Sequence, residues 1–153
     1  MARRPVVLTS LVSALALAGC GQSQTEKYED DFKALNDRLL KVGERIGTGL
    51  GSAGNQTNAK LASRFAGFAA DLEEVNDAIA DLEPPSELQG QSRALTQRTR
   101  VVVKDLRDIS KAARAGDRKA TTRATLAFGR HAQRLNQAQN RLARSTGADP
   151  GTN

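Results

Sequence analysis

The sequence predicts an all-α fold, an antiparallel, up-down-up-down four-helix bundle, on three observations. Apolar residues recur at alternating intervals of four and three within four segments, which is the repeat of helices packed with knobs in holes. The alternation of period two that strands require is absent. Short joints follow the second and third segments, and short joints make neighbouring helices antiparallel. The alternative is a three-helix bundle on which a thinner fourth helix packs loosely.

The four apolar segments cover residues 28–46, 61–82, 95–113 and 124–142. We expect the bundle as a whole to occupy residues 26–144. The first three rows are built mainly from leucine, valine, isoleucine and phenylalanine. The fourth row is thinner, because alanine and His131 hold several of its core positions. A chain of 153 residues with one such set of rows is expected to form one domain.

Capping residues and prolines mark the helix ends. Ser23 with Glu26, and Ser86 with Gln89, have the spacing of a capping box, in which two side chains satisfy free N–H groups at the start of a helix. Residues 84–85 are both proline. Because a proline pushes the preceding residue out of the helical region, the second helix should end there.

Three further segments lie outside the rows. Gly116 followed by Asp117 has the order of a glycine C-cap and an aspartate N-cap, which predicts a tight turn between the last two helices. Residues 47–54 hold four glycines in eight positions, so we expect a mobile loop. A binding lid is the alternative, although the segment lacks the lysine and hydroxyl residue that end a phosphate loop. The tail, residues 145–153, has no periodicity and is expected to be disordered.

The first 20 residues have the features of a targeting segment that ends in a single cysteine. Arg3 and Arg4 make a basic start, and residues 6–18 form an apolar run of 13 residues. That run is shorter than the roughly 20 residues that span a bilayer. Gly19 and the one cysteine of the chain, Cys20, follow this run, and residues 17–20 resemble the lipobox of bacterial lipoproteins. That resemblance implies a signal peptide of residues 1–19 and a tether of residues 20–25, with acyl chains such as palmitate on Cys20. A secreted protein with one unpaired thiol is the alternative.

Three motifs together resemble a group of small bacterial lipoproteins common in high-GC Gram-positive bacteria. They are a lipobox, Leu-Ala-Gly-Cys, at residues 17–20, a Leu-Glu-Pro-Pro turn at 82–85 and an Ala-Arg-Ala-Gly-Asp turn at 113–117. The resemblance covers most of the chain after the signal. It implies an all-helical domain held by lipid on the extracytoplasmic face of the cell membrane, and it implies no activity.

Charge is divided unevenly along the chain. Residues 20–89 hold 7 Lys and Arg against 13 Asp and Glu, a net charge of −6, whereas residues 90–153 hold 14 against 4, a net charge of +10. On the third helix, cations recur at outer positions of the apolar repeat. Such positions face away from neighbouring helices, so the bundle is not expected to neutralise them readily. They form the predicted contact surface, here called the basic stripe: Arg93, Arg100, Lys104, Arg107, Lys111 and Arg114.

The basic stripe has two interpretations. The simpler one is an arginine-rich helix face that only contacts solvent, because runs of charge on helices usually have no other role. The functional one is a surface for lipid headgroups, an anionic envelope polymer or an acidic protein partner. Nucleic acid is a poor candidate, because all five aromatic residues belong to the core rows and leave no platform for stacked bases.

Residues that could catalyse a reaction or bind a metal are few. The only histidine, His131, lies between Phe128 and Leu135 in the fourth row. A core histidine with a hydrogen-bond partner is a simpler interpretation than a ligand or a pH switch. No metal site, cofactor or nucleophile–base pair is expected, which argues against an enzyme. An acidic group on the second helix is expected to pair with the start of the basic third helix: Glu73, Glu74, Asp77 and Asp81.

The hypothesis from sequence is therefore a non-enzymatic, membrane-anchored extracytoplasmic lipoprotein that acts as an envelope interaction module through the basic stripe. The alternative is a carrier or sensor that holds a small apolar ligand between its helices. In that case the alanine-rich fourth helix and His131 would mark an underfilled cavity. A purely structural spacer is the third hypothesis.

Overall fold

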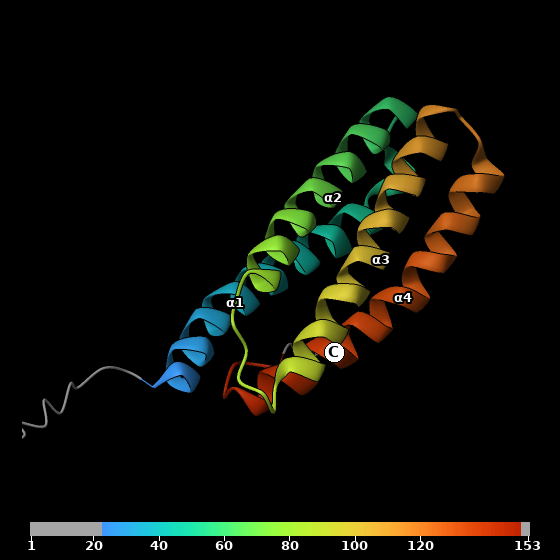
Figure 1. The fold of residues 1–153 in the computed structure, drawn as a ribbon. Coiled ribbons are helices and arrows are strands. Elements are labelled where there is room, and N and C mark those ends of the chain that lie inside the picture. Colours follow the sequence, from blue (N-terminus) through green and yellow to red (C-terminus); the bar gives the residue numbers. More distant parts are fainter. Residues whose placement is uncertain (1–22, 151–153) are drawn as a thin grey trace, which may run out of the picture.

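A computed structural model describes residues 23–150 and confirms the all-α four-helix bundle (Figure 1). Successive helices run in opposite directions, and residues 23–150 contain no strand. The expected signal peptide, the tether cysteine Cys20 and residues 151–153 lie outside the described part of the chain.

Four long helices and one short one make up the fold. The long helices are α1 (Gln24–Gly51), α2 (Asn58–Ala80), α3 (Gln89–Arg114) and α4 (Arg118–Ser145), and a 3-10 helix, η1 (Ala53–Asn55), joins α1 to α2. With 28 residues, α1 is about 42 Å long at 1.5 Å per residue. The helices pack most closely between α2 and α3 and between α3 and α4, whereas α1 packs mainly on α2 and has few contacts with α4.

The predicted apolar rows form the core. All five aromatic side chains are buried, and four of them pack in two pairs. Tyr28 stacks on Phe32, and the ring of Phe65 meets Phe68 edge-on with 5.7 Å between centroids. The row on α3 is buried along its whole length, but residues 118–127 at the start of α4 include no buried residue. The three-helix alternative is therefore wrong for α4 as a whole and describes only its first turns.

Local capping explains where α1 and α4 begin. The Ser23 hydroxyl accepts from the N–H of Glu26 at 3.2 Å, and the Glu26 carboxylate accepts from the N–H of Ser23 at 2.8 Å, as predicted. The last two residues of the expected tether are already helical, since α1 begins at Gln24. At the other predicted turn, Gly116 has a φ of 69° and Asp117 caps α4.

The second predicted capping box is wrong. Leu88, not Ser86, precedes α3, and the Ser86 hydroxyl donates to the neighbouring carboxylate of Glu87. The backbone supplies the physical reason. The carbonyl of Pro85 accepts from the N–H groups of Leu88 and Gln89 at 2.9 and 3.1 Å, so the turn after the prolines satisfies these donors itself.

The glycine run is helical instead of a mobile loop. Helix α1 continues through Gly51, and η1 follows almost at once. Leu50 packs against the core, and Gly49 is buried against Phe68, whose Cε2 would lie 2.5 Å from a Cβ at position 49. These contacts offset the cost of glycine in a helix, which is about 0.5–1 kcal/mol per residue relative to alanine.

The described part of the C-terminal tail is docked on the bundle, contrary to the expected disorder. Gly147 has a φ of 63°, the left-handed conformation that turns a chain back at the end of a helix. Ala148 is 6% exposed, and its N–H donates to the carbonyl of Ala143 at 2.9 Å. Residues 146–150 therefore cover one end of the bundle.

Gly49→Ala should lower the free energy of unfolding by about 1–3 kcal/mol, because the added Cβ would overlap the Phe68 ring and push α1 away from α2. Gly67→Ala is the matched control. Nothing lies within 4 Å of a Cβ at Gly67, so this variant should be as stable as the native chain or more so. Urea denaturation followed by circular dichroism measures both, and equal stability of the two variants would contradict the close contact.

Candidate functional site

The basic stripe lies on the outer surface of α3, and all six of its cations are exposed. Four of them form no ion pair with any residue in the described range: Arg93, Arg100, Lys111 and Arg114. The other two are neutralised. The stripe is thus a real surface feature, with free charge concentrated towards its two ends.

Lys104 and Arg107 are the neutralised members. Lys104 Nζ lies 2.6 Å from the carboxylate of Asp108, and this hydrogen bond and charge raise the pKa of Lys104 above its ordinary value. Arg107 crosses to α2 and donates to the carboxylate of Glu73. The expectation that neighbouring helices leave the stripe unneutralised is therefore wrong at Arg107, because its long side chain spans the space between α2 and α3.

The acidic group of α2 pairs differently from the prediction. Glu74 accepts from Arg38 of α1 at 2.6 Å, and Glu73 pairs with the middle of α3, not with its start. The reason is the antiparallel register, which places residue 73 well away from the turn into α3. Asp77 and Asp81, closer to that turn, form no ion pair within residues 23–150.

A second cluster of cations surrounds the turn between α3 and α4. Its five members are exposed, and none forms an ion pair with a described residue. The nearest acid in the sequence, Asp117, is engaged as the N-cap of α4 and accepts from the N–H of Ala120 at 2.9 Å. We call this cluster the basic tip: Lys111, Arg114, Arg118, Lys119 and Arg123.

The basic tip and the start of α1 lie at opposite ends of the bundle (Figure 1). The tip adjoins the start of α2, since Asn58 Nδ2 lies 3.6 Å from a Cβ placed at Gly116. Acids are concentrated at the end where α1 begins, in its first two turns, in the last turn of α2 and in the connection to α3. They are Glu26, Glu29, Asp30, Asp31, Asp77, Asp81, Glu83 and Glu87.

His131 has a hydrogen-bond partner, as the simpler interpretation predicted. Its Nδ1 lies 2.6 Å from Oδ2 of Asp105 on α3. The side chain of His131 is 31% exposed and that of Asp105 only 9%. The sequence analysis missed Asp105, although an acid between Val102 and Leu106 in a buried row needs a partner in the core. The pair links α3 to α4.

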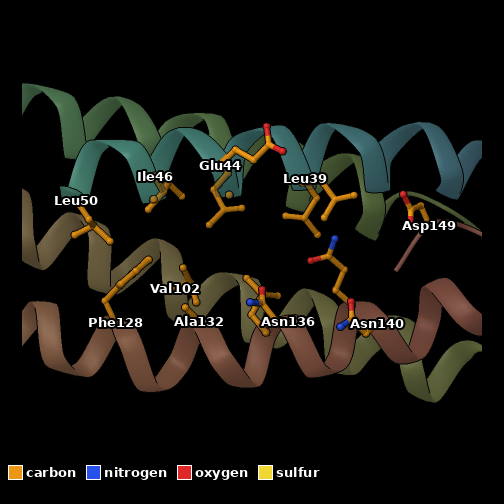
Figure 2. Close-up of a pocket in the computed structure, with 16 residues that line it drawn as sticks. Leu39, Glu44, Ile46, Leu50, Val102, Phe128, Ala132, Asn136, Asn140 and Asp149 are labelled. Carbon is orange, nitrogen blue, oxygen red and sulfur yellow. The ribbon is translucent and has the colours of Figure 1, made fainter. Parts of the chain in front are cut away.

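A cleft opens between α1 and α4 (Figure 2). Its volume is about 480 Å³, which falls in the range of about 300–1,000 Å³ for small-molecule sites. Ala132 lines it, so the underfilled space expected beside the alanine-rich helix exists. His131 does not line it, because its ring is engaged with α3. The apolar floor consists of Leu39, Ile46, Leu72, Val102, Phe128 and Leu135.

Buried amides close one end of this cleft. Asn36 of α1 is fully buried; its Nδ2 donates to the carbonyl of Asp149 at 2.8 Å. Its Oδ1 accepts from Nε2 of Gln139 on α4 at 3.0 Å. The periodic pattern did not predict that Asn36 is buried. The only indication was its position one helical turn after Phe32 of the first row.

Within residues 23–150, no group of three or more His, Cys, Asp or Glu side chains is placed to hold a metal ion. None of the helices in this range is long and apolar enough to cross a membrane. The candidate sites of the described chain are therefore the basic tip, the remainder of the basic stripe and the cleft.

His131→Ala should lower the free energy of unfolding by about 1–3 kcal/mol at pH 7, because it leaves the Asp105 carboxylate buried without its partner. Asp108→Ala is the control: it removes the exposed pair with Lys104 and should cost much less than His131→Ala, because solvent screens an exposed pair. Chemical denaturation measures both losses. Equal losses would argue against a buried, energetically coupled pair.

Comparison with known proteins assigns no relative: no protein-family model, no curated protein and no solved structure matches this chain. The support for a function comes from the geometry and charge of the chain itself.

Proposed function

We propose that this protein is a non-enzymatic lipoprotein, anchored through Cys20 on the extracytoplasmic face of the cell membrane, that acts as an interaction module of the envelope. The basic tip is its contact surface. The observation that carries the proposal is the gathering of five exposed cations around one turn of the bundle, none of which forms an ion pair within residues 23–150. The signal-like start and the lipobox support the anchor.

The three cations of the tip that belong to α4 are not explained by the stability of the helices, whereas Lys111 and Arg114 lie in the last turn of α3, where the helix dipole favours cations. Arg118 and Lys119 stand in the first turn of α4, where the positive end of the helix dipole disfavours cations. Lys119 and Arg123 are four residues apart on the same helix, a spacing at which like charges repel by a few tenths of a kcal/mol. Charged residues that lower the stability of the fold are candidates for residues retained because they bind a partner.

The position of the tip indicates where that partner lies. The tip is separated from the start of α1, and so from the expected anchor, by about the 42 Å length of that helix. Electrostatic attraction is screened over about 8 Å at physiological salt. With the bundle standing on its N-terminal end, the headgroups of the anchoring membrane would not reach the tip. The partner we propose is a linear anionic polymer of the envelope, which can contact several cations at once.

Reversing two tip charges, Arg114→Glu with Lys119→Glu, should weaken binding to long-chain polyphosphate at least about tenfold, because the local positive potential is lost. Residues 23–153, which contain all four helices, are titrated at low and at physiological salt, and circular dichroism confirms unchanged helicity. Lys27→Glu with Lys41→Glu is the matched control: it makes the same change in net charge on the exposed face of α1.

The control separates local from overall charge. It should bind polyphosphate nearly as well as the native chain, with the same steep dependence on salt. A loss as large in the control as in the tip variant would contradict the assignment of the tip. Binding to anionic phospholipid vesicles without binding to polyphosphate would assign the surface to headgroups instead. If the chain binds neither, the proposal of an anionic polymer is wrong and an acidic protein remains as the partner.

The anchor has its own test. Protein isolated from membranes should have the mass of residues 20–153 plus a diacylglycerol group. Two acyl chains are enough to keep it in the membrane fraction, because each buried methylene contributes about 0.8 kcal/mol. Cys20→Ala should carry no added lipid and should keep residues 1–19. Mass spectrometry of the intact protein distinguishes the two. A native chain of unmodified mass would contradict lipidation.

A further inference from the structure

We infer that the cleft between α1 and α4 binds a single-chain amphiphile whose head carries no negative charge. The inference rests on the shape and lining of the cleft and is independent of the basic tip. It develops the hypothesis of a small apolar ligand held between the helices, because it names the site and the class of ligand.

The cleft is apolar at one end and polar at the other (Figure 2). Leu50 and Phe128 stand at the apolar end, over the floor of core side chains. Asn140 and Asp149 stand at the opposite end, where Gln139 also lines the cleft. An apolar chain lying along the floor would therefore place a hydrogen-bonding head among amides, whose N–H and C=O groups suit hydroxyls.

The lining selects against an anionic head. Of the 16 residues within the described range that line the cleft, none is a lysine, arginine or histidine, although the chain has 23 lysines and arginines. The two charged residues of the lining are both acids, Glu44 and Asp149. An anionic headgroup would meet repulsion and find no counter-charge, whereas an uncharged, hydroxylated head would find acceptors and donors.

Two glycines keep the cleft open without being required by the fold. Gly43 and Gly47 line it on α1, one helical turn apart. Neither has a positive φ, and a Cβ at either position would meet nothing within 4 Å. A larger residue would favour the helix, since glycine costs about 0.5–1 kcal/mol there relative to alanine. Gly49, in contrast, is needed for close packing on Phe68.

Gly47→Leu is therefore a variant that fills the cleft while keeping the helix. Its matched control is Gly67→Leu on α2, which is equally open around its Cβ but does not line the cleft. Residues 23–153 of each are titrated by calorimetry with monododecanoylglycerol and with dodecanoate, both below their critical micelle concentrations. The two probes share one chain length and differ in the charge of the head.

The native chain and Gly67→Leu should bind monododecanoylglycerol with the same affinity, and Gly47→Leu should bind it at least about tenfold more weakly, because the side chain occupies the ligand's space. Dodecanoate should bind the native chain at least about tenfold more weakly than the uncharged probe. The melting temperature of Gly47→Leu should not fall below that of the native chain. If this variant does not fold, Gly43→Leu takes its place, since its Cβ is equally free.

Three results would overturn the inference: no binding of monododecanoylglycerol to the native chain, unchanged affinity in folded Gly47→Leu (or in Gly43→Leu where it takes its place), or a preference for dodecanoate. The charge-reversal variant of the basic tip should bind the uncharged probe as the native chain does. Failure of the tip as a polymer site and failure of the cleft as a ligand site are therefore distinguishable.

Discussion

The contact between α1 and α4 determines much of the shape of this molecule, and it depends on one buried amide. Asn36 is bonded both to Gln139 of α4 and to the carbonyl of Asp149 after it. Leaving such a buried group unpaired costs about 1–3 kcal/mol, so α1, α4 and the C-terminal segment are held together at this end. The two helices have few other contacts, and the cleft lies between them.

The order of helices around the core decides which cations are free. Helix α2 packs on α1 and α3, and its acids accept Arg38 and Arg45 from one side and Arg107 from the other. Exposed pairs of this kind contribute only about 0–1 kcal/mol each. They matter here because they neutralise cations along the middle of the bundle. The end of α3 and the start of α4 lie beyond the reach of these acids. Positive charge therefore accumulates at the basic tip.

The helices could be predicted from sequence because their rows depend only on local periodicity. The buried face of α3, from Leu95 to Ala113, is an example. The predictions that fail are those decided by tertiary contacts. Gly49 is helical because it fits against Phe68, and the tail is docked because Ala148 is buried. The partner of His131 lies 26 residues away on another helix, and the pairing of Arg107 depends on the register of two helices. A linear pattern specifies neither.

The side of the cleft that α1 forms was the least predictable feature, and the reason lies in its glycines. In the linear sequence, Gly47 and its neighbours predict a flexible loop, because four glycines in eight positions disfavour any regular structure. Once tertiary contacts make the segment helical, every glycine in it occupies a defined face. Gly49 then turns towards α2 and closes the packing there, while Gly43 and Gly47 turn towards α4 and leave space opposite Ala132. The glycines that weaken α1 as an isolated helix thus allow close packing on α2 along one side and leave the space of the cleft along the other.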